Sequence, residues 1–141
     1  MARYEARVAN IAPLRIQVGT SDNPIQILAV SAKGLGTTGQ VSRPCLSRPS
    51  TPGKGTGKVL AHVPRPPEPS FATTGVSVIT TFTAAPSYPL VAVGSFNLPL
   101  FIEWRVPTGS GMFVPNDDFA LLYAFAAGGA KWNGSMEWEN L

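Results

Sequence analysis

Apolar and polar residues alternate with a period of two along much of this chain, which is the pattern of strands with one buried face. Near the N-terminus, the alternation predicts strands over Tyr4–Val8 and Leu14–Val18. A third strand is predicted over Ile25–Ala32, where apolar residues follow one another directly. Such a run is typical of a central strand with both faces buried.

The middle of the chain is less regular. Gln40–Ser47 predicts a strand at a sheet edge, because Pro44 has no amide hydrogen to donate to a neighbouring strand. Prolines and glycines then interrupt the chain from Arg48 to Ser70, which predicts a long loop with a few extended residues at Val59–Val63. Val76–Thr83 alternates strongly again and predicts a further strand.

A short strand over Leu90–Val93 and a turn over Gly94–Leu98 lead into the C-terminal block. There, Phe101–Val106 and Met112–Pro115 each predict a strand. Gly134–Glu139 predicts an amphipathic strand near the sheet edge, with Glu137 and Glu139 on a solvated face.

Phe119–Ala127 has apolar residues on both faces, which favours a central strand. A helix is the alternative, since Asn116-Asp117-Asp118 would cap one. The aromatic residues spaced two apart and the Gly-Gly that follows favour the strand.

The 141 residues contain 14 glycines and 14 prolines, and only 13% are charged, which disfavours long helices. Eight to ten short strands without a repeat predict one all-β domain over residues 1–141. We expect a two-sheet antiparallel β-sandwich of the jelly-roll kind, with residues 48–70 as a Pro/Gly-rich basic loop. No apolar run approaches the ~18 residues of a membrane span, so we expect a soluble protein that is used without export.

The net charge of +3 is unevenly distributed, since no acidic residue occurs between Asp22 and Glu68. The basic residues of this region predict an attachment element for an acidic partner surface. We expect Arg43, Arg48, Lys54, Lys58 and Arg65 to contribute to it. DNA phosphates are the second choice of partner, because the total charge is modest and aromatic residues are not interleaved with the basic ones.

No motif predicts a catalytic residue, a metal or a cofactor. Gly53-Lys54-Gly55-Thr56-Gly57-Lys58 fails as a phosphate loop, because it has three residues between its outer glycines where four are needed. His62 is the only histidine and is expected in a loop without a function. Cys45 is the only cysteine and is expected to be buried, which excludes an internal disulfide. Asp117 and Asp118 are expected to bond the backbone in a turn.

Two further signals have structural explanations. Asn133-Gly134-Ser135 matches a glycosylation sequence but is better explained as a turn. Trp104, Trp132 and Trp138 could form a sugar-stacking platform, although packing in the core is the more common role of tryptophan.

The chain resembles small virion proteins of tailed bacteriophages. The resemblance spans nearly the whole chain as a loose pattern. It is carried by Tyr4-Glu5-Ala6-Arg7-Val8-Ala9-Asn10, Pro24-Ile25-Gln26-Ile27-Leu28, the Gly/Thr/Pro-rich middle with Arg43, Pro44 and Arg48, and an ending with Val106-Pro107, Val114-Pro115, Leu121, Ala126 and Gly134 to Glu139.

The resemblance implies a jelly-roll β-sandwich that acts as a capsid decoration or cement protein. Such proteins often sit as homotrimers on the outside of the phage head, where they tie neighbouring capsomers together. The expected partner is a major capsid protein, and the expected location is the surface of a virion assembled in the host cytoplasm. A carbohydrate-binding or adaptor β-sandwich of a phage tail or fibre is the alternative, and an enzyme is the third choice.

Overall fold

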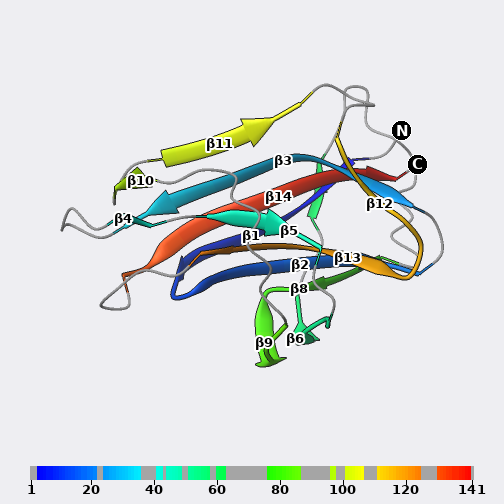
Figure 1. The fold of residues 1–141 in the computed structure, drawn as a ribbon, viewed down its shortest axis with the longest axis horizontal. Helices are drawn as coiled ribbons and strands as arrows, with labels where there is room; N and C mark the ends of the chain where they lie inside the picture. Colours follow the sequence, from blue (N-terminus) through cyan, green and yellow to red (C-terminus); the bar gives the residue numbers. More distant parts are fainter. Residues whose placement is uncertain are drawn as a thin grey trace.

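The computed structural model describes residues 3–21, 24–35, 41–42, 44–48, 51–57, 60–62, 76–86, 96–97, 101–106, 111–124 and 130–140. Its described residues form antiparallel strands and no helix (Figure 1). The all-β prediction is therefore confirmed.

The largest sheet has six strands, and its long members come from the two ends of the chain (Figure 1). Its order is β11 (Phe101–Arg105), β3 (Ile25–Gly34), β14 (Trp132–Asn140), β1 (Arg3–Ile11) and β7 (Leu60–His62), with β12 (Met112–Val114) also paired to β3. Every pairing in this sheet is antiparallel. The predicted central position of Ile25–Ala32 is confirmed, since β3 has neighbours on both sides.

A second sheet has four strands. Its order is β5 (Cys45–Ser47), β13 (Asp118–Ala124), β2 (Leu14–Thr20) and β8 (Val76–Ile79). β13 occupies the strand that was predicted to be central from its two apolar faces, and it lies between β5 and β2. The strand interpretation is confirmed over the described part of this segment, and the helix alternative is wrong there.

Two short ribbons complete the described strands. One pairs β4 (Val41–Ser42) with β10 (Phe96–Asn97), and the other pairs β6 (Lys54–Thr56) with β9 (Thr81–Ala84). We call the second pair the β6–β9 ribbon. It extends from the four-stranded sheet at the lower side of Figure 1.

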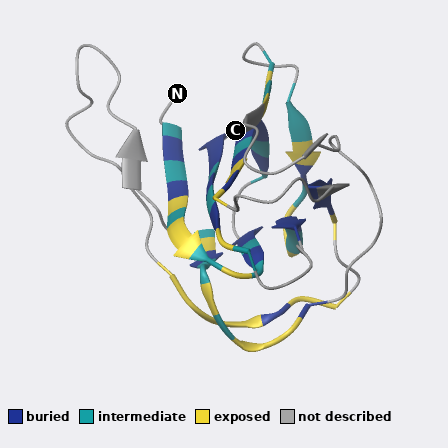
Figure 2. Cartoon of the chain, turned by 90° about the vertical axis from the view of Figure 1, so that its left-hand side faces the viewer, coloured by how far each residue is buried: buried dark blue, intermediate teal, exposed yellow. Residues whose placement is uncertain are grey.

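One core cluster joins the two sheets. Along β2, Leu14, Ile16 and Val18 are fully buried in this cluster, and along β14, Trp132, Met136 and Trp138 are fully buried in it as well. The alternation of buried and more exposed positions is visible along β1, next to the N-terminus in Figure 2. Residues from both sheets thus share one apolar interior, and burial of this apolar area is the main force that holds the sheets together.

Four predictions from the sequence need correction. Gly134–Glu139 is not an edge strand, because β14 lies between β3 and β1. Asn133 and its neighbours belong to this strand rather than to a turn. The predicted turn at Gly94–Leu98 contains β10, and the predicted strand Val76–Thr83 is divided at Thr80 into β8 and β9, which pair with different partners.

The predicted loop over residues 48–70 also differs where it is described. It contributes β6, which pairs with β9, and β7, which pairs with β1 and includes His62. Strand pairing is non-local, so a segment without its own apolar period can still be ordered by a partner strand. Leu90–Val93 lies outside the described residues.

Candidate attachment surface

Two of the five basic residues predicted to bind a partner are described. Arg48 follows β5 and Lys54 begins β6, and both are exposed. Arg43, Lys58 and Arg65 lie outside the described residues. The described part of the predicted attachment element is therefore centred on the β6–β9 ribbon and the outer face of the four-stranded sheet.

Gln17 fastens the segment before β6 to this outer face. Its neighbours Ile16 and Val18 face the core cluster, so Gln17 projects from the opposite side of β2, where it is only 2% exposed. The backbone N–H of Gly53 donates to Gln17 Oε1 over 2.8 Å, and Gln17 Nε2 donates to the carbonyl of Gly53 over 3.4 Å. One side-chain amide thus satisfies both backbone groups of a buried residue.

The glycines of this segment allow close packing. A Cβ atom added to Gly53 would lie 2.7 Å from the ring of Phe82, and one added to Gly57 would lie 2.5 Å from the carbonyl oxygen of Val78. Gly55 has a φ of 156°, and a Cβ there would lie 2.0 Å from the carbonyl oxygen of Thr81. The glycines that resemble a phosphate loop in the sequence thus let β6 approach the β8–β9 backbone.

Aromatic contacts hold the other half of the ribbon. Phe82 packs on a second small apolar cluster formed by Cys45, Leu121 and Tyr123, which lies on the outer face of the four-stranded sheet. The guanidinium carbon of Arg15 lies 4.7 Å from the centre of the Phe82 ring, at cation–π distance. Cys45 is 2% exposed, so its predicted burial is confirmed.

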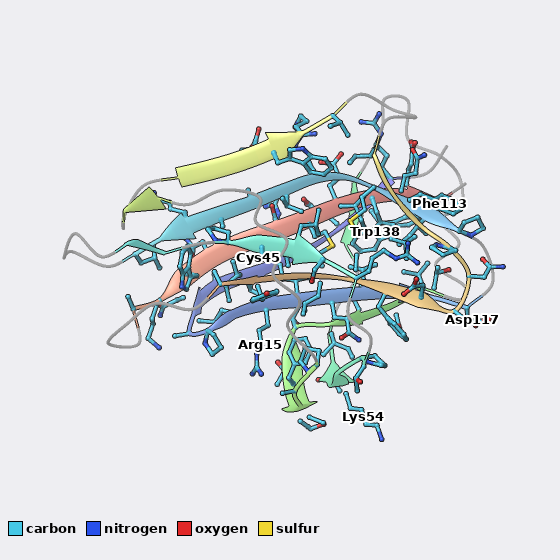
Figure 3. The ribbon with its side chains drawn as sticks, in the orientation of Figure 1. Arg15, Cys45, Lys54, Phe113, Asp117 and Trp138 are labelled. Carbon is cyan, nitrogen blue, oxygen red and sulfur yellow. The ribbon has the colours of Figure 1, made fainter. Side chains whose placement is uncertain are left out.

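The two described site residues have different surroundings. Arg48 forms an ion pair with Asp118, the first residue of β13, and its side chain is 47% exposed. Lys54 is exposed at the start of β6 and lies with Arg15 on the lower side of the molecule in Figure 3. Lys54 is therefore presented to solvent by a ribbon whose backbone is fixed, whereas Arg48 is engaged within the fold.

The prediction for Asp117 and Asp118 holds in part, since the Asp118 carboxylate bonds the backbone, but Asp118 is the first residue of β13 rather than a turn residue. Asp117 lies in the turn before β13 with a φ of 62°, and its N–H donates across the sheet to the carbonyl of Thr20 at the end of β2. Asp118 Oδ1 accepts a hydrogen bond from the N–H of Phe119 over 2.8 Å. Both residues therefore shape the chain where it enters β13, and Asp118 is engaged by Arg48 as well.

The tryptophans pack inward. Trp132 and Trp138 are fully buried in the core cluster, and Trp104 is partly buried against it. Trp138 faces Tyr4 on the neighbouring strand, with ring centres 6.2 Å apart. Core packing is confirmed for these side chains, so Trp132 and Trp138 do not provide a sugar-stacking platform.

The outer face of the six-stranded sheet buries two acidic side chains that the sequence pattern placed in solvent. Glu137 was expected to be solvated, yet it is 5% exposed, with Oε2 lying 3.2 Å from Nη1 of Arg105 and Oε1 lying 3.8 Å from Nη1 of Arg3. Glu139 is 1% exposed, and its Oε1 has no hydrogen-bond partner. Their central strand explains the difference, since neighbouring strands flank β14 on both sides.

A hollow of about 470 Å³ opens on the same face. Arg7, Ser31, Lys33, Asn133 and Ser135 line it, together with small apolar residues. Sequence reasoning missed these residues, because they come from three strands, two near the start of the chain and one near its end. The alternation along each strand predicts which of them point outward, but not that the strands are neighbours.

Among the described residues, no group of three or more His, Cys, Asp or Glu side chains is arranged to hold a metal ion. Within the same residues, no helix has the length and apolarity to span a membrane.

Comparison of the chain with protein-family models, with curated proteins and with solved structures finds no match.

Proposed function

We propose that this chain is a non-enzymatic virion structural protein, a decoration or cement protein that binds the outside of a phage head. The observation that carries the proposal is the exposed Lys54 on a ribbon held to the sheet by Gln17 and Gly53. A cation on a fixed backbone loses little conformational entropy when it docks on an acidic surface. This property suits a protein that clips rigid capsomers together.

In this proposal, the two sheets are the layers of a β-sandwich of the jelly-roll kind. Support comes from the core cluster, to which both sheets contribute residues, and from the antiparallel pairings within each sheet. The outer face of the four-stranded sheet then faces the capsid, and Lys54 contacts the acidic surface of a major capsid protein. The undescribed Arg43, Lys58 and Arg65 belong to the same proposed surface through their positions in the sequence.

We further propose that the protein binds as a homotrimer. Capsids have local threefold positions, and a trimer engages three equivalent acceptor sites at once. Avidity then offsets the weakness of single exposed ion pairs, which contribute only about 0.2–1 kcal/mol each. Light scattering of the purified protein should give three times the mass of the chain, and a monomer both free and on particles would refute this part.

Two experiments test the function: one locates the protein on assembled particles, and the other measures how substitutions weaken its binding to them. A gold-labelled antibody against this chain should decorate the heads of assembled particles, and labelling confined to tails would refute the cement function. In co-sedimentation with particles that lack the protein, the double substitution Lys54→Ser and Lys58→Ser should reduce binding. Lys54→Ser alone should also reduce binding, and Lys131→Ser, which removes one exposed cation outside the proposed surface, is the charge-matched control for that single variant.

Arg48 is tested separately, because its ion pair with Asp118 gives it a role in the fold. If the folded double variant binds particles as well as the unmodified protein does, the β6–β9 ribbon is not the attachment element. The contact face would then have to lie elsewhere on the sheets.

A further inference from the structure

The hollow on the outer face of the six-stranded sheet combines two cations with two hydroxyl groups. The pairing register places Arg7 opposite Ser135 and Ser135 opposite Ser31, so these three form a row across β1, β14 and β3. Lys33 lies two residues beyond Ser31 on β3, opposite Asn133. Arg7 and Lys33 therefore approach the hollow from strands about 10 Å apart, within reach of long side chains.

The polar groups that remain available in the hollow are hydrogen-bond donors. Arg7 Nη2 lies 2.9 Å from Glu5 Oε1, but a guanidinium has five N–H donors and the Arg7 side chain is 63% exposed. Lys33 is exposed and forms no ion pair with the described residues. Both cations can thus turn donors toward a bound group.

The uncharged residues add donors of their own. Ser31 Oγ and Ser135 Oγ lie 2.5 Å apart, so one hydroxyl hydrogen joins them and the other remains free to donate. Asn133 Oδ1 accepts from the N–H of Asn10 over 2.9 Å, which leaves the Asn133 amide N–H groups as donors. A site that presents donors and positive charge is complementary to an anion.

The acidic residues nearby are already engaged. Glu5 pairs with Arg7, and Glu103, opposite Ser31 on β11, lies 3.7 Å from Arg105. Among the described residues that line the hollow, none is acidic. A carboxylate that enters from solvent therefore meets two cations without an acidic side chain in the wall.

We propose that this hollow binds the side-chain carboxylate of an acidic segment from another protein. A planar carboxylate matches the fork of Arg7 and can accept from Lys33 and the serine pair. No aromatic side chain lines the described wall, so the stacking surface that commonly holds a sugar ring is missing there. This site lies on a different sheet from Lys54, and the inference does not rest on the proposed function.

The test is a titration of the isotope-labelled full chain with hexaglutamate at low salt, followed by NMR. Saturable shifts are expected at the amides of Arg7, Ser31, Lys33 and Ser135. Lys33→Gln should weaken binding about threefold to fivefold, as expected for one exposed charge pair, and Arg7→Gln with Lys33→Gln should abolish it. Lys131→Gln is the control, since Lys131 is an exposed cation that does not line the hollow, and its loss should leave the affinity nearly unchanged.

Neutral hexaglutamine and the acidic sugar trigalacturonate complete the experiment. The proposal is overturned if hexaglutamate produces no saturable shifts, or if hexaglutamine binds equally well. It is also overturned if Lys131→Gln weakens binding as much as Lys33→Gln, because attraction to the net charge of the chain would then account for the binding without a specific site. Binding of trigalacturonate alone would assign the hollow to a glycan instead. The NMR spectrum of each variant shows directly whether it is folded.

Discussion

The side-chain amide of Gln17 and the backbone of Gly53 are joined by two hydrogen bonds, 36 residues apart in the sequence. Both partners are buried, so water does not replace these bonds when one partner is removed. Gln17→Leu should therefore lower the free energy of unfolding by about 1–3 kcal/mol, because the N–H of Gly53 loses its acceptor. Urea unfolding measures this loss, and limited proteolysis at residues 51–57 should become faster.

Gln26→Leu is the matched control for Gln17→Leu. Its Oε1 is buried and has no hydrogen-bond partner, so the same substitution removes no described bond. We expect its stability to change by less than that of Gln17→Leu. Equal losses in the two variants would show that Gln17 does not anchor the segment through Gly53.

Cys45 provides a chemical probe of the β6–β9 ribbon. Phe82 packs on the cluster that contains Cys45, so Phe82→Ala should expose the thiol and accelerate its reaction with a disulfide reagent in the folded protein. Phe113→Ala is the control, because Phe113 is 49% exposed on β12, at the opposite side of Figure 3 from Lys54. Unchanged labelling in Phe82→Ala would mean that the ribbon does not shield Cys45.

Substitution by glutamine should change the free energy of unfolding in opposite directions at Glu137 and Glu139. Glu139→Gln removes a buried charge whose Oε1 lacks a partner, and it places an amide opposite Gln26, whose own Oε1 needs a donor. We expect it to raise the free energy of unfolding by about 1 kcal/mol. Urea unfolding at neutral pH is the measurement, and a loss of stability would show that the carboxylate of Glu139 is compensated.

Glu137→Gln removes a charge that has partners. The carboxylate lies near Arg105 and Arg3, whose side chains are 53% and 37% exposed. Solvent weakens these attractions, so we expect a decrease of about 1 kcal/mol at most. The decrease should shrink as salt is added, and no dependence on salt would contradict an electrostatic origin.

Substitutions of Arg48 and Lys54 should differ in their effect on stability, because Arg48 has an ion pair within the fold and Lys54 is exposed on the surface. Arg48→Ser breaks the ion pair with Asp118 and should lower stability by less than about 1 kcal/mol, since both side chains are partly exposed. Lys54→Ser should leave stability unchanged. A double-mutant cycle of Arg48→Ser with Asp118→Asn measures the coupling, and additive losses would show that the ion pair contributes nothing.

The sequence by itself determined the fold class and most of the strands. The two-residue period is a local property of strand geometry, so the alternation of Leu14, Ile16 and Val18 with Arg15 and Gln17 separates core positions from outer ones without knowledge of the neighbours. The same period places Ser135, Glu137 and Glu139 on one face of their strand. The burial of Cys45, Trp132 and Trp138 also follows from residue chemistry.

Only the tertiary structure decided which of the outward faces are covered. Glu137 and Glu139 are buried because β14 pairs with β3 and β1, which lie near the other end of the chain, and no local pattern encodes that order. The glycines around Lys54 suggest flexibility in the sequence, but they allow the β6 backbone to pack beside Phe82 and Thr81. The hollow beside Arg7 and Lys33 also arises from strand pairing, which brings polar residues from distant parts of the chain together. Such pairing requires contacts that close long loops, and these contacts cannot be predicted from a local pattern.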